Sequence, residues 1–213
     1  PALRRDYAKV YLPIMCSQVL WGISVPMQTA ILGHLSDDAI AANSIATTFY
    51  QYLKVIVIAM SSVSAVMIGS AIGRGEMKRI KSDARSMAAI DVAIGCTLAA
   101  VLFVLRGPLV SLYDLTPEAA EMARNLIAVM SVVMIGMSYQ MPGSFGDAGF
   151  TMKMNLISTW LIVMPLSFMA AFWWKWPVEA VVLVIQSDQI FKGLPTFLRF
   201  RKYQWMKKLT QDG

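Results

Sequence analysis

The chain has 213 residues, of which 57% are hydrophobic and only 15% are charged. An ordinary soluble domain has about 25% charged residues, so this composition favours an all-α integral membrane protein. The net charge is +6, but the cations stand in groups between apolar runs, which argues against a nucleic-acid-binding protein. Two cysteines, Cys16 and Cys96, are too few for a disulfide scaffold, and the residue spacing predicts no metal site.

Long apolar stretches recur along the whole chain. A helix that crosses a bilayer needs about 20 mainly apolar residues to span the hydrocarbon. The sequence predicts a polytopic six-helix bundle that forms one lobe over residues 1–213, with spans at approximately 10–33, 43–73, 84–105, 122–146, 154–174 and 178–198. The third and sixth spans are the weakest, because the third contains Asp91 and the sixth contains Asp188 and Lys192.

The distribution of Lys and Arg predicts the orientation of the spans, because these residues are retained on the cytoplasmic side of short loops. Of the 19 Lys and Arg, 15 lie in the leading segment, the second and fourth loops, and the tail with the adjoining end of the last span. The alternate loops contain only Arg106 and Lys175. We therefore expect an integral protein of the bacterial inner membrane with both termini in the cytoplasm.

Short motifs add local detail to this outline. Gly69, Gly73 and Gly75 do not have the spacing of a phosphate-binding loop, but Gly69-x-x-x-Gly73 predicts a helix face that another helix can approach closely. Thr116, followed by Pro117 and an acidic residue, predicts the N-terminal cap of a helix in the third loop. We find no Ser-His-Asp set, Cys-His pair or cluster of carboxylates, so the sequence does not indicate an enzyme.

Charged residues inside spans are the first candidates for function, because each costs about 2.5 to 3.5 kcal/mol to insert. Asp188 and Lys192 are four residues apart, which predicts an ion pair on one helix face. That pair either fixes the sixth helix against its neighbours or takes part in an ion relay. Lys54 either pairs with Asp188 or Asp91, or lines a cleft where it meets an anionic group. For Asp91 we expect a structural role.

Four stretches resemble the second half of a transporter of the MATE (multidrug and toxic compound extrusion) family. They are "LPIMCSQVLWGISVPMQTAILGHLSDDAIAANSIA", "AVMIGSAIGRGEMKRIKSDAR", "NLISTWLIVMPLSF" and "FLRFRKYQWMKKL". Members of this family have twelve helices in two similar lobes and export organic cations and other drugs in exchange for sodium ions or protons. The resemblance implies that this chain is the C-terminal lobe and that the N-terminal lobe is absent from it.

Two departures from the family pattern stand out. Relatives have a glycine-rich turn after the fourth helix of this lobe, whereas here Gly146 is followed directly by Asp147, as if several residues were missing. Many relatives also place an acidic coupling residue in the first helix, where this chain has Trp21. The resemblance then implies that the coupling acid belongs to the N-terminal lobe.

The resemblance also places the first, second and fourth helices of the lobe around a central cleft. On that basis the candidates for substrate contact are Gln18, Trp21, Gln51 and Tyr139, and the charged Lys54 and Asp188 are added as candidates for the substrate or ion pathway because of their position inside spans. We expect cation-coupled efflux of drugs or other organic compounds by alternating access, with sodium or protons as coupling ion and no other cofactor. Expected partners are membrane lipids, a small organic substrate, and the missing lobe or a second copy. The alternatives are a lipid-linked saccharide flippase of the same superfamily, an inactive fragment and a non-transporting membrane scaffold.

Overall fold

The fold was determined as a computed structural model, which describes residues 2–75, 77–140 and 148–202. Nearly all of these residues are helical, which confirms the predicted all-α fold. The helices are α1 (Ala2–Gly33), α2 (Asp37–Gly73), α3 (Met77–Val110), α4 (Pro117–Gln140), α5 (Ala148–Asn155), the π-helix η2 (Leu156–Val163), α6 (Met164–Phe172), α7 (Val178–Gln186) and α8 (Asp188–Arg201). Segments α5, η2 and α6 follow one another without interruption and form one rod.

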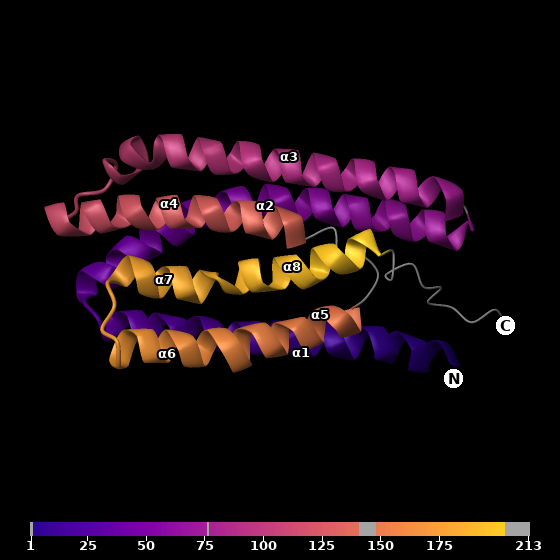
Figure 1. Cartoon of the computed structure of the whole chain (residues 1–213), viewed down its shortest axis with the longest axis horizontal. Helices are drawn as coiled ribbons and strands as arrows, with labels where there is room; N and C mark the ends of the chain where they lie inside the picture. The colour runs from indigo at the N-terminus through magenta and orange to yellow at the C-terminus, as the bar shows by residue number, and fades with distance from the viewer. Residues whose placement is uncertain (1, 76, 141–147, 203–213) are drawn as a thin grey trace.

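The helices form two groups that run along a common axis (Figure 1). Helices α2, α3 and α4 pack against one another, and α1 packs against the rod of α5, η2 and α6. Between the groups lie α7 and α8, both of which contact α4. The beginning of α1 and the end of α8 lie at the same end of the bundle, as expected for a chain that crosses an even number of times.

Helix α4 supplies the centre of the hydrophobic core. Its Leu126, Ile127, Met130 and Met134 are fully buried, because neighbours cover it on several sides. Small residues on adjacent helices, such as Ala46 of α2, allow these long side chains to interdigitate. By contrast, most large apolar side chains of α1 are exposed, as expected for a surface that meets lipid or another protein.

Five helical segments are long and apolar enough to cross a membrane: Ile14–Gly33, Asp37–Ala71, Ile80–Val110, Pro117–Tyr139 and Met152–Phe172. The sixth predicted span does not form one continuous helix. It is divided at Ser187 into α7 and α8, and neither piece is long enough to cross alone. Nevertheless, α7 and α8 together run alongside the other helices (Figure 1).

The helices are longer than the predicted spans at several ends. The first begins at Ala2 instead of residue 10, the second at Asp37 instead of 43, and the third at Met77 instead of 84. Hydropathy locates only the part inside about 30 Å of hydrocarbon, and a helix of 37 residues is about 55 Å long at about 1.5 Å per residue. The predicted end of the fourth span, together with the Gly146–Asp147 junction, lies outside the described residues.

Glycine supports one close helix contact, but not the predicted one. A Cβ atom added to Gly69 or Gly73 would meet no atom within 4 Å, so the prediction of a close approach there is wrong within this lobe. The close approach occurs instead between α3 and α4, where a Cβ atom on Gly95 would lie 2.3 Å from the Cβ of Ser138. At Gly75, glycine serves a turn after α2 with a φ of 75°.

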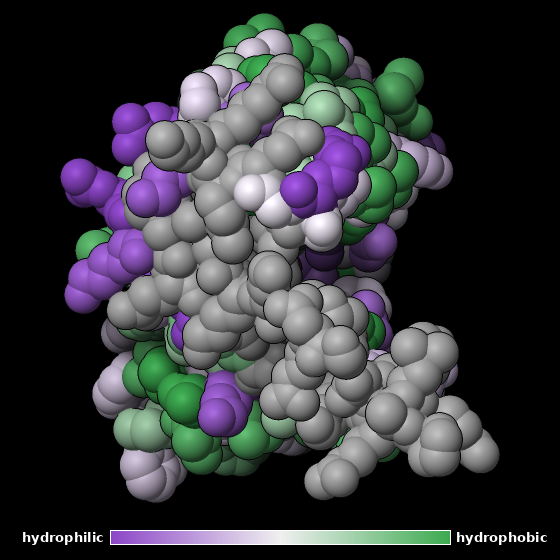
Figure 2. Space-filling view, turned by 90° about the vertical axis from the view of Figure 1, so that its right-hand side faces the viewer, coloured by the Kyte–Doolittle hydropathy of each residue, from purple (hydrophilic) through white to green (hydrophobic). Residues whose placement is uncertain are grey.

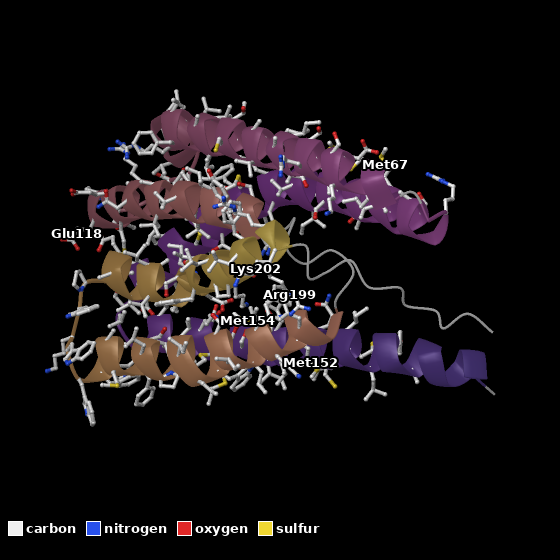
Figure 3. All side chains as sticks on the ribbon, turned by 45° about the vertical axis from the view of Figure 1, so that its right-hand side comes forward. Met67, Glu118, Met152, Met154, Arg199 and Lys202 are labelled. Carbon is white, nitrogen blue, oxygen red and sulfur yellow. The ribbon has the colours of Figure 1, made fainter. Side chains whose placement is uncertain are left out.

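Charged residues separate towards the two ends of the bundle. Figure 2 views the bundle from the end where α1 begins and shows hydrophilic side chains there beside the apolar flanks. In Figure 3, Glu118 lies near the opposite end, away from Arg199 and Lys202 at the end of α8. At the end with Glu118, exposed Trp173, Trp174 and other aromatic residues follow α6, where rings favour the membrane interface.

Candidate functional site

A polar pocket of about 380 Å³ opens between the two helix groups. We call it the central pocket, and its polar and aromatic lining comprises Trp21, Ser24, Gln28 and Thr29 from α1, Asn43, Ser44, Thr47, Thr48, Tyr50, Gln51 and Lys54 from α2, Thr159 from η2, and Gln186, Asp188 and Gln189 from α7 and α8. Its size lies within the range of about 300 to 1,000 Å³ that is usual for small-molecule sites. So many polar groups inside an apolar bundle favour a solvated binding site.

Helical spacing explains how two of the walls are built. Residues three and four apart lie on one face of a helix. On α1 this spacing brings Trp21, Ser24 and Gln28 to the pocket, and on α2 it brings Gln51 and Lys54 there one and two turns beyond Thr47.

The third wall depends on two irregular helix segments. Segment η2 is wider than an α-helix, and it places buried Ser158 and Thr159 opposite the break between α7 and α8. At this break, Ser187 accepts hydrogen bonds on its carbonyl from the amides of Ile190 and Phe191, and α8 begins at Asp188. An acidic side chain at a helix N-terminus is stabilised by the helix dipole.

Asp188 lies at the centre of a dense hydrogen-bond network. Its Oδ1 accepts hydrogen bonds from the hydroxyls of Ser158, at 2.7 Å, and Thr159, at 3.1 Å. Its Oδ2 accepts a hydrogen bond from Nζ of Lys192, which forms the ion pair that the four-residue spacing predicts. Lys192 is only 5% exposed and also donates to Oγ1 of Thr159 at 3.3 Å. The carboxylate is therefore paired with a cation and accepts three hydrogen bonds.

Lys54 forms no ion pair with Asp188 or Asp91. Its Nζ lies 5.7 Å from the ring centroid of Trp21 and 5.8 Å from that of Tyr50, and the side chain lines the central pocket. Of the two alternatives predicted for Lys54, the structure therefore supports a position in the lining of the central pocket and not an ion pair with Asp188 or Asp91.

Asp91 lies elsewhere, within the bundle on α3. It is 1% exposed, and among the described residues neither carboxylate oxygen meets the geometry of a hydrogen bond, although the side chain of Ser64 on α2 lies beside it. It does not line the central pocket. Among the residues that the structure describes, no three His, Cys, Asp or Glu side chains are grouped so that they could hold a metal ion.

The predicted site residues fall into two sets. Trp21, Gln51, Lys54 and Asp188 come together at the central pocket. Gln18 is exposed on α1 but does not line it. Tyr139 is also outside the pocket, and its ring packs edge-on against Phe197 at 6.0 Å. None of this establishes a role in transport, so all six residues remain predictions.

Sequence reasoning missed the remainder of the polar lining. Gln28 and Thr47 could have been found from their spacing, because each shares a helix face with a predicted site residue. No comparable signal identifies Ser158 and Thr159, which contact Asp188 across about 30 positions of sequence.

Comparison of the chain with known proteins identifies its family. The family model described as MatE matches residues 12–169, which is most of the chain. The chain belongs to the MatE family. The predicted resemblance is thus confirmed, and the relatives are transporters, not enzymes.

MatE relatives are recognisable at moderate identity. A probable multidrug resistance protein NorM of Xylella fastidiosa is 27% identical over 90% of this chain and 45% of its own length. An uncharacterized transporter, YisQ of Bacillus subtilis, is 21% identical over 96% of this chain and 46% of its own length. This MatE chain therefore spans about half the length of the relatives it matches.

Solved structures support the MatE fold. A crystal structure of MATE in the straight conformation superposes with a TM-score of 0.84 at 13% identity, covering 95% of this chain and 47% of that one. The Vibrio cholerae MATE transporter VcmN in the bent form gives a TM-score of 0.78 at 20% identity, covering 92% and 45%. With the apolar helices, these matches identify this MatE chain as an integral membrane protein.

Proposed function

We propose that this chain is the C-terminal half of a cation-coupled exporter of small organic compounds. The observation that carries the proposal is the central pocket, a polar chamber that lies between two groups of helices in an otherwise apolar bundle. The names of the relatives, such as multidrug resistance protein NorM, support export of drugs as the activity.

The mechanism that fits this arrangement is alternating access. Two lobes rock around a shared site near the middle of the membrane and open it to one side at a time. This chain supplies one wall of that site, and a second lobe supplies the other. In the proposed cycle, sodium ions or protons move inwards at an acid outside this chain as the compound moves out.

The proposal can be tested in everted vesicles from the bacterial inner membrane. One sample contains this chain alone, and the other contains this chain joined to the N-terminal half of the Xylella fastidiosa relative. We expect ATP-independent uptake of a fluorescent dye, driven by an imposed sodium or proton gradient, only in the second sample. Uptake by the chain alone would contradict a half-transporter, and absence of uptake from both would favour an inactive fragment or scaffold.

A lipid-linked saccharide flippase is the second candidate, and Lys54 is the observation that favours it. A cation lining the central pocket suits the phosphate groups of such a lipid. The same vesicles distinguish the two candidates, because a flippase would move a fluorescent lipid pyrophosphate between leaflets and leave the dye where it is.

A further inference from the structure

The charges at the central pocket sum to one excess positive charge when Lys192, which pairs with Asp188 but is not part of the lining, is counted together with Asp188 and Lys54. Asp188 is matched by Lys192, and both of its carboxylate oxygens already accept hydrogen bonds. Its capacity to attract a positively charged compound is therefore small. Lys54 contributes a further positive charge that has no acidic partner among the described residues.

The contacts of Lys54 with Trp21 and Tyr50 offset only part of the free energy that is needed to place its charge inside the membrane. Placing a cation in the middle of a membrane helix costs about 2.5 to 3.5 kcal/mol on insertion scales. A cation–π contact contributes about 0.5 to 1 kcal/mol when exposed and about 2 kcal/mol when desolvated. The rings of Trp21 and Tyr50 lie at the outer limit of that interaction, at 5.7 and 5.8 Å. An anionic group brought by a ligand would supply the missing compensation.

Trp21 provides the second half of a recognition surface. Its side chain is 54% exposed, lines the same pocket and lies beside the ammonium of Lys54. A flat aromatic ligand can therefore stack near Trp21 while an acidic substituent reaches Lys54. Neutral polar groups such as Gln51 and Gln28 line the pocket around them and suit the other heteroatoms of the ligand.

We propose that the central pocket binds aromatic compounds that carry an anionic oxygen group, such as a carboxylate or sulfonate, with that group on Lys54 and the ring against Trp21. This inference rests on the proposed function and names its substrate class. Organic anions and zwitterions are bound, whereas compounds with only a positive charge are disfavoured by this lobe.

Two probes with the same ring and opposite charge test the proposal. The full 213-residue chain is placed in nanodiscs of uncharged phospholipid, and binding of naphthalene-1-sulfonate and 1-naphthyltrimethylammonium is measured by equilibrium dialysis. We expect the sulfonate to bind at least about tenfold more tightly, a difference of about 1.4 kcal/mol. Equal binding, or tighter binding of the ammonium compound, would overturn the proposal.

Variants of Lys54 identify the residue responsible. Lys54→Met should weaken sulfonate binding about tenfold and leave the ammonium probe unaffected or more tightly bound, because the removed charge attracts only one of them. Lys54→Arg keeps the charge and should retain sulfonate binding. The matched control is Lys153→Met, which removes an exposed cation that does not line the pocket. Unchanged sulfonate binding by Lys54→Met, with unchanged thermal unfolding, would overturn the assignment.

A second arm identifies the source of the anionic group. Adding phosphatidylglycerol to the nanodiscs should leave sulfonate binding unchanged, because the proposed ligand is a soluble aromatic compound. Displacement of the probe by this lipid would assign the site to a headgroup and overturn the proposal. The vesicle experiment keeps the two claims apart. Dye export without Lys54-dependent anion binding would contradict only this inference. Anion binding without dye export would contradict only the proposed function.

Discussion

The Asp188–Lys192 pair is the most strongly constrained feature at the scale of single residues. The two side chains are 13% and 6% exposed, and Ser158 and Thr159 complete their hydrogen bonds. A buried pair of this kind gains little relative to apolar residues of the same size, but losing one partner leaves a charge uncompensated. Through the hydroxyls of Ser158 and Thr159, the pair on α8 is connected to η2. Because each charge needs its partner, we expect a substitution of either residue alone to be destabilising.

This imbalance leads to a prediction for Asp188→Asn and Lys192→Met. Each single variant should lower the free energy of unfolding by about 3 to 5 kcal/mol, because an unpaired charge or an unmatched carboxylate remains buried. The double variant should recover most of that loss, because no charge is left. The measurement is reversible unfolding in mixed micelles, analysed as a double-mutant cycle.

The control for this cycle is Lys153→Met, an exposed substitution that should change the free energy of unfolding by less than about 0.5 kcal/mol. A double variant as unstable as the sum of the singles would contradict a structural pair. In the joined transporter, loss of coupling in the double variant at normal stability would assign the pair to an ion relay instead.

How far the sequence predicts individual sites depends on whether the contacts are local. The four-residue spacing of Asp188 and Lys192 was sufficient to predict their pairing, and the polar face of α2 contains Gln51 and Lys54 in helical register. Tyr139 fails to reach the pocket because membership of a helix does not determine which face it presents.

At the scale of whole elements, helices α3 and α4 make a close contact at a glycine. Of the described glycines, Gly95 is the one where an added Cβ atom would lie nearest to another atom. Gly95 faces Ser138 at a distance that leaves no room for a methyl group. Gly95→Ala should therefore force the two helices apart and lower the free energy of unfolding by about 1 to 3 kcal/mol. Ser138→Gly in the same chain should recover part of the loss, because it removes the atom that clashes. Unfolding in mixed micelles measures both.

Gly69→Ala is the matched control for that prediction. The site is also a helical glycine, but nothing lies within 4 Å of an added Cβ atom. Alanine should stabilise the helix there by about 0.5 to 1 kcal/mol, because it reduces the backbone freedom of the unfolded chain. If the two substitutions had the same effect, close packing at Gly95 would not be the cause.

The ends of a helix could be predicted where they are determined by interactions between residues close together in the sequence. Thr116 caps α4 as predicted, since its Oγ1 accepts a hydrogen bond from the amide of Ala119 at 3.2 Å. The break at Ser187 was not predictable, because neither proline nor glycine lies beside it and its backbone stays near helical values. The break is associated with the Asp188 network, which involves η2, and such a tertiary contact leaves no mark in the sequence of α7 and α8 alone.

At the scale of the whole molecule, the lobe consists of two helix groups, and its two ends differ in their exposed side chains. Hydrophilic side chains lie at the end where α1 begins (Figure 2), and exposed aromatic residues such as Trp173 and Trp174 gather at the other. The pocket lies between the groups, with α1 and η2 contributed by one group, α2 by the other, and α7 and α8 by the layer between them. A relative movement of the groups would change the pocket, which suits a transporter better than a static scaffold.

The orientation of this lobe in the membrane follows from the same asymmetry and can be measured by cysteine labelling. In a chain with Cys16→Ser and Cys96→Ser, Arg74→Cys and Asp114→Cys place single thiols in the loops at the two ends of α3, both at exposed positions. Because Lys and Arg are retained in the cytoplasm, a membrane-impermeant maleimide should label only Asp114→Cys in intact cells and Arg74→Cys only in everted vesicles. Labelling of both from one side would place these two loops on the same face of the membrane, and the reversed pattern would put both ends of the chain outside the cell. The first result would contradict a membrane-spanning α3, and the second would contradict the predicted cytoplasmic location of both termini.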